Sequence, residues 1–238
     1  MKELGALVGP GIRIDLASDT PIFRRPYRYS DMERDLIRSK TLDLLEAGLV
    51  ELSHGEYASA TVMPVKKDVH GNYTERRMCG DYRPINRQTK ADRYAMPTPE
   101  EIFDVVGHAR IFSTLDLRAG YHQLPIRVSD KAKTTFWGVN SYGKDCLYQW
   151  RFLPFGLKNA PAEFQRVMDR ILAGLDFVRC YIDDILVFSD TVEEHQKHLQ
   201  IVFERLKAHG LRLHPGKCRF FHEDVEYLGH VIYPSGLG

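Results

Sequence analysis

Two adjacent carboxylates, Asp183 and Asp184, lie between apolar runs in the segment CYIDDILVFS, residues 180–189. A third, Asp116, lies near the end of the apolar segment ARIFSTLDL, residues 109–117. If both segments pair in one sheet, the three carboxylates meet at one edge, where their mutual repulsion needs compensation. Carboxylate oxygens hold Mg2+ together with phosphate oxygens, and pairs of such ions support in-line phosphoryl transfer. The sequence therefore predicts a metal site for phosphoryl transfer at these three residues.

The segment around the Asp-Asp pair also has a simpler interpretation. Two aspartates are a common turn sequence, because their short side chains bond to nearby backbone groups. Tyr181 and Ile182 before the pair and the apolar residues 185–188 after it predict a hairpin with the carboxylates at its tip. This context makes the pattern more specific than an isolated turn dipeptide.

Helix and strand signals alternate along the chain. Capping-box patterns, Ser30 with Glu33 and Thr191 with Glu194, open two amphipathic helices that glycines end. Two more helices are predicted at about 99–106 and 159–174. Strands or hairpins are predicted at 59–67, 76–83, 109–117, 133–150, 180–189, 211–214, 218–221 and 226–233. Because helices are mixed with antiparallel strands, the predicted class is α+β.

The composition excludes several classes of protein. The chain has 238 residues, of which 43% are apolar and 27% charged, as in soluble globular proteins. No apolar run is long enough for a membrane span, and the N-terminus does not resemble a secretory signal. The four cysteines form no CxxC pair, so we expect reduced cysteines rather than a structural zinc site.

The net charge of +1 is distributed unevenly. Residues 66–93 contain eight Lys or Arg against four acids, and residues 181–200 contain five acids against one lysine. This asymmetry suits a protein that brings a polyanion and a cation together. Two solvated faces of opposite sign are the alternative, and charge counts alone favour it.

Longer motifs make the chain resemble the reverse transcriptase domain of gypsy-type LTR retrotransposon polyproteins, which are related to retroviral polymerases. The motifs follow the order and spacing of that family over roughly residues 20–235. They are VKKD (65–68), RRMCGDYRPIN (76–86), FSTLDLRAGYHQLPI (112–126), RFLPFGLKNAPAEFQRVMD (151–169), YIDD (181–184), HGLRLHPGKCRF (209–220) and VEYLGHVI (225–232).

The resemblance implies a right-hand polymerase fold with fingers and palm, in which helices pack on an antiparallel palm sheet. Residues 1–29 would form an extended segment or linker, and 30–238 the reverse transcriptase domain. The fingers would comprise about 30–107 and 127–155, and the palm about 108–126 and 156–238. The thumb, RNase H and integrase regions of such a polyprotein are not expected within this chain.

The resemblance also assigns roles to individual residues. Asp116, Asp183 and Asp184 would be catalytic metal ligands, with Mg2+ as the cofactor and Mn2+ as an alternative. Lys217 would act as the acid for the departing pyrophosphate, or else is an ordinary surface lysine. The nucleotide would contact Lys66 or Lys67, Arg77, Leu117, Tyr121, Phe155, Gly156 and Lys158. The primer and template would contact Tyr181, Pro161, Tyr227, Leu228 and Gly229.

Two of these roles have specific physical reasons. The guanidinium of Arg77 would compensate triphosphate charge. The ring of Tyr121, five residues after Asp116, would clash with a ribose 2′-hydroxyl and so select deoxynucleotides. A packed core tyrosine is the alternative for Tyr121 when it is taken alone.

The implied function is an RNA- and DNA-directed DNA polymerase that is part of a retrotransposon polyprotein. Its partners would be a deoxynucleoside triphosphate and an RNA or DNA primer-template, with no membrane. It would act inside the cell, in a cytoplasmic virus-like particle or in the nucleus. Two alternatives stay open: a truncated, domesticated or decayed nucleic-acid-binding module without turnover, and a subunit completed by a partner chain. The sequence does not indicate the oligomeric state.

Overall fold

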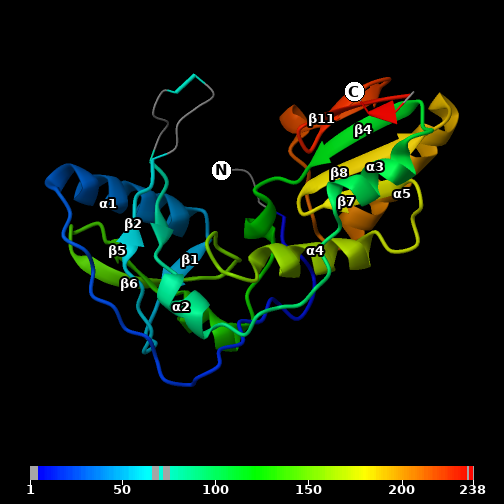
Figure 1. The fold of residues 1–238 in the computed structure, drawn as a ribbon. Helices are drawn as coiled ribbons and strands as arrows, with labels where there is room; N and C mark the ends of the chain where they lie inside the picture. Colours follow the sequence, from blue (N-terminus) through cyan, green and yellow to red (C-terminus); the bar gives the residue numbers. More distant parts are fainter. Residues whose placement is uncertain (1–4, 66–69, 72–75, 235, 238) are drawn as a thin grey trace. The chain divides into compact units, whose positions relative to one another are not determined.

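The structure, a computed structural model, describes residues 5–65, 70–71, 76–234 and 236–237. The described residues divide into two compact units, which we treat separately (Figure 1). The first unit contains residues 10–91 and 124–160, and the second contains residues 5–9, 92–123 and those from 161 onward. Which residues belong to the fingers and which to the palm stays a prediction.

The first unit is built on two small sheets. A three-stranded antiparallel sheet has the order β1-β6-β5, and β2 pairs with β3. The predicted capping box is present at the first helix, where Ser30 and Glu33 bond to each other's backbone N–H groups. The elements of this unit are α1 (Asp31–Glu46), β1 (Val50–Leu52), β2 (Thr61–Val62), β3 (Cys79–Gly80), α2 (Arg83–Gln88), the 3-10 helix η2 (Val128–Thr134), β5 (Phe136–Val139) and β6 (Asp145–Trp150).

The second unit is built on a four-stranded antiparallel sheet of order β7-β8-β4-β9. A separate sheet, β10-β11-β12, packs beside it. The elements of this unit are α3 (Pro99–Val106), β4 (Ile111–Asp116), η1 (Gly120–Gln123), α4 (Ala160–Ile171), β7 (Val178–Tyr181), β8 (Asp184–Ser189), α5 (Val192–Ala208), η3 (Pro215–Lys217), β9 (Arg219–His222), β10 (Val225–Tyr227), β11 (His230–Tyr233) and β12 (Gly236–Leu237).

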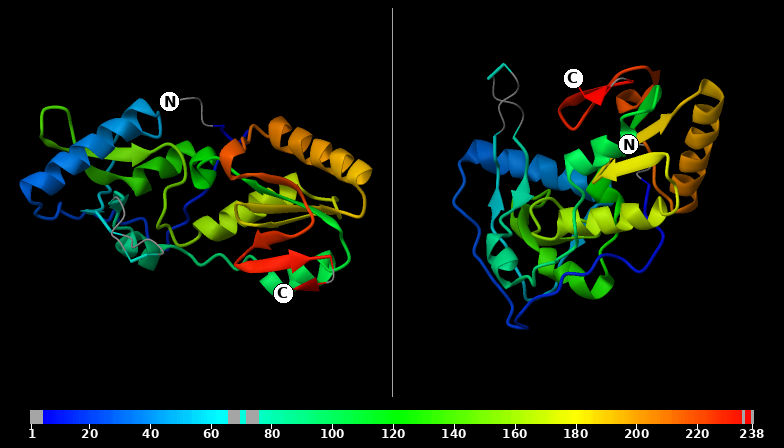
Figure 2. Two further views of the ribbon diagram at one scale, coloured as in Figure 1. Left: turned by 90° about the horizontal axis from the view of Figure 1, so that it is seen from above. Right: turned by 45° about the vertical axis from the view of Figure 1, so that its right-hand side comes forward.

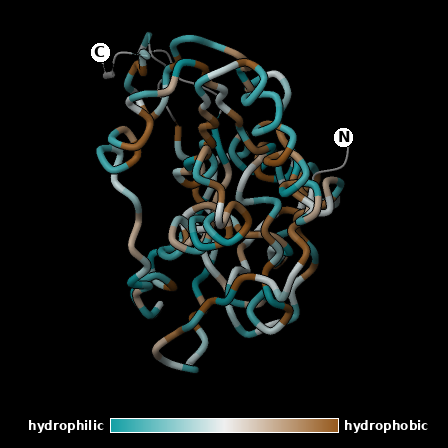
Figure 3. The backbone as a smooth tube through the Cα atoms, turned by 90° about the vertical axis from the view of Figure 1, so that its right-hand side faces the viewer, coloured by the Kyte–Doolittle hydropathy of each residue, from teal (hydrophilic) through white to brown (hydrophobic). Residues whose placement is uncertain are grey.

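Side chains alternate between the two faces of the sheet, and both faces are buried along β4 and β8, whereas the edge strand β9 is exposed. On one face, α5 lies along the sheet and the α3 helix and C-terminal strands lie on the other (Figure 2, left). A buried cluster fills the second face; it contains side chains of α3, β4, β8, β10 and β11. Hydrophilic and hydrophobic residues are mixed within the helical coils of the tube in Figure 3, as in helices with one buried side.

Buried polar contacts fix α5 against this sheet. His195 is fully buried. Its Nε2 lies 2.6 Å from Ser113 Oγ on β4, and its Nδ1 lies 2.7 Å from Ser189 Oγ on β8. Burial lowers the pKa of His195 to about 4, so the ring is neutral at pH 7. The helix is thus tied to the two strands that carry Asp116 and Asp184.

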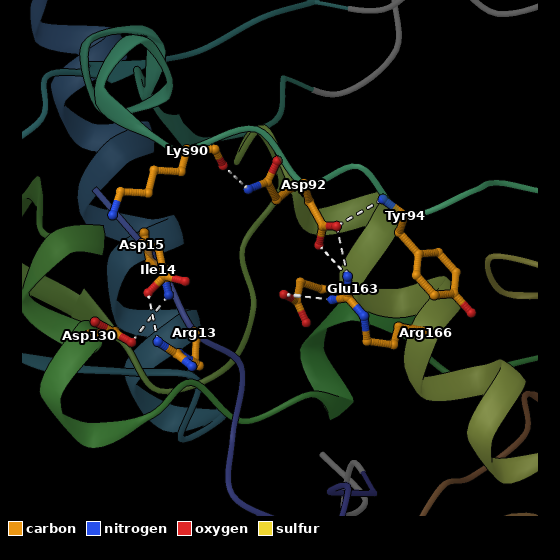
Figure 4. A network of polar contacts seen from close by, with 10 residues as sticks. Arg13, Ile14, Asp15, Lys90, Asp92, Tyr94, Asp130, Glu163 and Arg166 are labelled. Carbon is orange, nitrogen blue, oxygen red and sulfur yellow. Dashed lines mark hydrogen bonds and ion pairs between the residues drawn. The ribbon is translucent and has the colours of Figure 1, made fainter. Parts of the chain in front are cut away.

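A second set of polar contacts holds the segment before α3 against α4 (Figure 4). Arg166 of α4 donates two hydrogen bonds to Asp92 at 2.7 Å and forms an ion pair with Glu163 at 3.0 Å. Its guanidinium lies over the ring of Tyr94, whose hydroxyl bonds to Asp169. The charges of this set are largely compensated within the unit.

The predicted α+β class is confirmed, and so are the helices at α1, α3, α4 and α5. The predicted element at 226–233 is confirmed as a hairpin, in which the chain reverses at Leu228 and Gly229. The predicted strand at 211–214 is wrong, because these residues contribute only an isolated bridge between Leu213 and Leu117. The structure adds α2, which begins where the predicted strand 76–83 ends.

Within the part of the chain that the structure describes, no helix combines the length and apolar character that a membrane span needs.

Candidate active site

The pairing of β4 with β8 brings two of the predicted carboxylates together. These strands are antiparallel over six residue pairs, from Ile111 opposite Ser189 to Asp116 opposite Asp184. Directly opposed side chains project to the same face of a sheet and lie about 5 Å apart at Cβ. The apolar residues that precede Asp116 and follow Asp184 bury the shared ladder and make its end rigid. The two carboxylates therefore share the open end of a packed sheet.

Asp183 lies in the turn of the β7–β8 hairpin. Tyr181 is paired with Asp184, so Ile182 and Asp183 form a two-residue turn. Ile182 has a φ of +55°, whereas Asp183 has a negative φ, which is the sign pattern of a type II′ turn. Glycine normally occupies the first turn position, and a β-branched residue is strained there. Such strain persists only where neighbouring groups hold it, and it is concentrated at functional sites.

Gln165 of α4 holds this strained turn. It is fully buried, and its Oε1 accepts a hydrogen bond of 2.7 Å from the backbone N–H of Ile182. Its Nε2 donates to the carbonyl of Cys180 at 3.0 Å and to Asp169 at 2.8 Å. One side chain thus fixes the backbone on both sides of Tyr181 and sets the direction of the Asp183 side chain.

The surroundings of Asp183 disfavour its charge. Gly120 leaves room for it: a Cβ at Gly120 would lie 3.3 Å from the Cβ and Oδ2 of Asp183. Burial raises the pKa of Asp183, and Asp116 raises it further; its own backbone N–H and Lys217 act in the opposite direction. The charge of Lys217 therefore does not offset the effects of burial and of Asp116 on Asp183.

Asp184 shows the same effect more strongly. Burial, followed by repulsion from Asp183 and Asp116, raises the pKa of Asp184 to about 6. Its backbone is held by Tyr227 of β10, whose hydroxyl donates to the Asp184 carbonyl at 2.8 Å. Among the residues that the structure describes, no three His, Cys, Asp or Glu side chains already stand in a metal-binding arrangement. The oxygen donors and the uncompensated repulsion nevertheless fit a divalent cation.

A cavity of about 380 Å3 opens at this end of the sheet. Asp116 and Asp184 line it together with Lys217 of η3. Its other wall is the β10–β11 turn, where Leu228 and Gly229 have φ of +51° and +76°, the sign pattern of a type I′ turn. A leucine is strained in that conformation. Two strained hairpin turns thus flank the carboxylates.

The remaining predicted residues of the second unit lie near this sheet, and their roles stay predictions. Tyr121 of η1 is half-buried, with its ring 5.3 Å from that of Phe164, and burial followed by the charge of Asp183 raises its pKa to about 12. The side chain of Leu117 is buried, so a nucleotide would meet only its backbone. Tyr181 packs against the buried cluster beside Asp184, and Pro161 lies in the first turn of α4.

The other predicted nucleotide contacts belong to the first unit. Arg77 is exposed, as is Phe155, at 52%. Gly156 has a φ of +93°, which a side chain would strain. The carbonyl of Gly156 accepts a hydrogen bond from Asn86 at 2.8 Å, and the Lys158 N–H donates to Asn86 Oδ1 at 2.8 Å. The predicted contacts Lys66 and Lys67 lie outside the described residues.

Sequence reasoning missed three residues that this geometry makes important. Gln165 and Asn86 fix the two loops that carry predicted site residues, although both lie inside motifs quoted for the resemblance. Arg219 lines the cavity with the carboxylates. Amide side chains that bond to loop backbone carry no local sequence signal, because their partners lie 17 and about 70 residues away. Arg219 would have been found only from the pairing of β9 with β4.

We predict that Gln165→Met exposes the strained turn. Methionine keeps the volume of glutamine but cannot accept the Ile182 N–H, so hydrogen exchange at Ile182 should become about tenfold faster. Exchange is read by NMR at pH 7. Gln200→Met, on the exposed side of α5, is the matched control and should leave the Ile182 rate unchanged. An unchanged rate in Gln165→Met would show that Gln165 does not hold the turn.

Comparison with known proteins places this chain in a family. The sequence profile described as "Reverse transcriptase (RNA-dependent DNA polymerase)" matches residues 65–232. The Pol polyproteins of the Drosophila melanogaster transposons 297 and gypsy are 34% and 36% identical to the chain over 227 residues, 94% of its length. The chain spans about a fifth, 21%, of each of these relatives.

Solved structures agree with this similarity. The foamy viral protease-reverse transcriptase dRH in complex with double-stranded DNA matches 99% of the chain and 40% of its own, with a TM-score of 0.82 and 24% identity. A second structure of the foamy viral protease-reverse transcriptase with double-stranded DNA is 26% identical, with a TM-score of 0.80. It covers the whole chain and 48% of its own. The predicted right-hand polymerase fold is confirmed by this likeness, and the chain belongs to the reverse transcriptase (RNA-dependent DNA polymerase) family.

Proposed function

We propose that the chain is the polymerase domain of a retrotransposon Pol polyprotein and extends a DNA primer on an RNA or DNA template. The oxygen of the primer 3′-hydroxyl forms a bond to the α-phosphorus of a deoxynucleoside triphosphate. The bond from that phosphorus to the bridging oxygen breaks, and pyrophosphate leaves with its electron pair. The hydroxyl proton passes from the attacking oxygen to solvent water. The product is a primer longer by one nucleotide.

The observation that supports this proposal best is the shared position of Asp116, Asp183 and Asp184. Their oxygen donors and the raised pKa of the last two suit a site that takes up divalent cations. When bound, Mg2+ or Mn2+ would supply positive charge to the phosphate oxygens and to the attacking and leaving oxygens. The task of the protein is to hold the three carboxylates on rigid strands, which the β4–β8 ladder and Gln165 accomplish.

Other side chains take separate roles in this proposal. Lys217 lies in the carboxylate cavity and donates a proton to the leaving pyrophosphate. Arg77 and one of Lys66 or Lys67 bind the triphosphate, and Phe155, Gly156 and Lys158 support the nucleotide. The fixed loop at Gly156 and the exposed ring of Phe155 suit such a contact.

The partners follow from the relatives. The foamy viral enzyme has been solved with double-stranded DNA and with an RNA/DNA hybrid, and the transposon relatives are polyproteins. We propose that this chain likewise binds an RNA or DNA template with its primer, and that further regions of a polyprotein contribute to binding. Synthesis would occur inside the cell, in a cytoplasmic virus-like particle or in the nucleus.

We predict that Asp183→Asn abolishes most primer extension. The variant keeps the size of the side chain but removes a charge needed for cation binding, so the rate should fall by about two to three orders of magnitude. The measurement is extension of a labelled DNA primer on an RNA template with Mg2+, and then with Mn2+. Asp176→Asn, an exposed aspartate in the loop before β7, is the control and should extend like the wild type.

Two outcomes would count against the proposal. Equal extension by the wild type and Asp183→Asn would remove the catalytic assignment of this carboxylate. Salt-sensitive duplex binding without any extension by the wild type would favour a nucleic-acid-binding module instead.

We predict that Tyr121→Val weakens discrimination between sugars. Removing the ring opens the space for a 2′-hydroxyl, so the preference for deoxynucleotides should fall by at least about tenfold. The measurement is the ratio of kcat/KM for matched deoxy- and ribonucleoside triphosphates. Tyr142→Val, at an 86% exposed position of the first unit, serves as the control. An unchanged ratio in Tyr121→Val would leave Tyr121 as a packing residue only.

A further inference from the structure

We propose that Arg219 binds a backbone phosphate of the primer strand one to two nucleotides behind its 3′ end. The inference rests on the proposed polymerase function and adds a residue that positions its polymeric substrate. It starts from the cavity beside the carboxylates, whose wall includes the first residue of β9.

The sheet register fixes where Arg219 lies. Arg219 on β9 is paired with Thr114 on β4, and Asp116 follows two residues later on β4. Residues two apart on a strand share a face, so Arg219 is on the same face as Asp116. The cavity confirms this placement, because Thr114, Asp116 and Arg219 all line it.

The charge of Arg219 is available to a ligand. It is exposed, and within the described part of the chain it makes no ion pair or side-chain hydrogen bond. Arg166 of the same unit, in contrast, is paired with Asp92 and Glu163. A guanidinium presents several donors in a planar fork that fits phosphate oxygens. Asp116, Asp184 and Glu226 line the same cavity, but none of them forms an ion pair with Arg219, so its guanidinium can take a phosphate group.

The spacing favours the primer over the nucleotide. Thr114, the residue paired with Arg219, lies two residues before Asp116, which corresponds to about 7 Å along β4. In the proposed complex the primer strand runs along β4, so this offset corresponds to about two nucleotide rises of 3.4 Å. The offset runs into the sheet, away from the hairpin turn with Asp183. Lys217, which favours the charged form of Asp183, lies closer to that turn. Arg219 is thus placed behind the reacting end.

The backbone around Arg219 is held firmly. Phe221, two residues later, has a φ of +56° at the irregularity in β9, and its N–H donates to Ser113 Oγ at 3.1 Å. Ser113 is in turn bonded to the buried His195. On the other side, the His214 N–H donates to the Asp116 carbonyl at 2.8 Å. The position of Arg219 relative to Asp116 is therefore set by β4 itself.

The test couples a protein change to a change in one phosphate. A fluorescent primer-template is titrated with the 238-residue chain without nucleotide, and anisotropy gives Kd. In the first set of duplexes, one of the last two phosphate linkages of the primer is replaced by an uncharged methylphosphonate. In the matched set, the primer is unmodified and the replaced linkage is the one at the corresponding base pair of the template strand. The proteins are wild type, Arg219→Gln, Arg219→Lys and Arg110→Gln. Arg110 is an exposed arginine at the opposite end of β4.

We expect Arg219→Gln and one neutral primer linkage each to weaken binding about tenfold, and to weaken it no further when combined. Arg219→Lys should retain part of the affinity, and Arg219→Gln should reduce the salt slope of binding by about one. Arg110→Gln should leave the effect of the neutral linkage intact.

The proposal would be overturned if Arg219→Gln and the neutral primer linkage together raised Kd about a hundredfold, since independent effects multiply. It would also be overturned if Arg219→Gln bound the duplex with wild-type affinity. Coupling to the template linkage instead would also overturn it. The result does not depend on turnover. If Arg219 is coupled to the primer phosphate but the chain extends no primer, the polymerase function is contradicted and the Arg219 contact is not. If the chain extends primers but shows no such coupling, the Arg219 contact is contradicted and the polymerase function is not.

Discussion

Electrostatic repulsion among three carboxylates at the end of one strand pair is the constraint on which the rest of the second unit depends. The antiparallel register opposes Asp116 to Asp184, and the turn adds Asp183. Without a cation, the pKa of Asp183 and of Asp184 is raised. Burial raises these pKa values most, and the repulsion adds to it as long as the fixed backbone keeps the carboxylates from moving apart. The buried strands, the α5 helix and the C-terminal hairpin provide that fixation.

The fixation is concentrated at two turns. Ile182 and Leu228 both have positive φ, and neither residue adopts this conformation readily. Each turn is anchored to another element. Gln165 of α4 holds Ile182, and Tyr227, the residue before Leu228, donates from its hydroxyl to the Asp184 carbonyl on β8. The strained residue Ile182 thus precedes the carboxylates, and the strained residue Leu228 is itself a proposed primer contact. This distribution is typical of sites whose geometry matters for chemistry.

The sequence predicted what local patterns control. Ser30 with Glu33 located a helix start because capping is local, and apolar runs located β4 and β8. The positive φ of Leu228 could not be predicted, because leucine rarely adopts that conformation. The roles of Gln165 and Arg219 depend on pairing between distant segments. The three carboxylates could be named in advance, whereas their supporting contacts could not.

The most direct test of this account is the titration of the Asp184 carboxyl in protein free of divalent ions, followed by carbon-13 NMR. The account predicts a midpoint near pH 6, since burial and two neighbouring charges raise the pKa to about 6. Asp183→Asn removes one of these charges and should lower the midpoint, and Mg2+ should lower it in the wild type. A midpoint near the ordinary aspartate value of about 3.9, unchanged by Asp183→Asn or by Mg2+, would contradict the account.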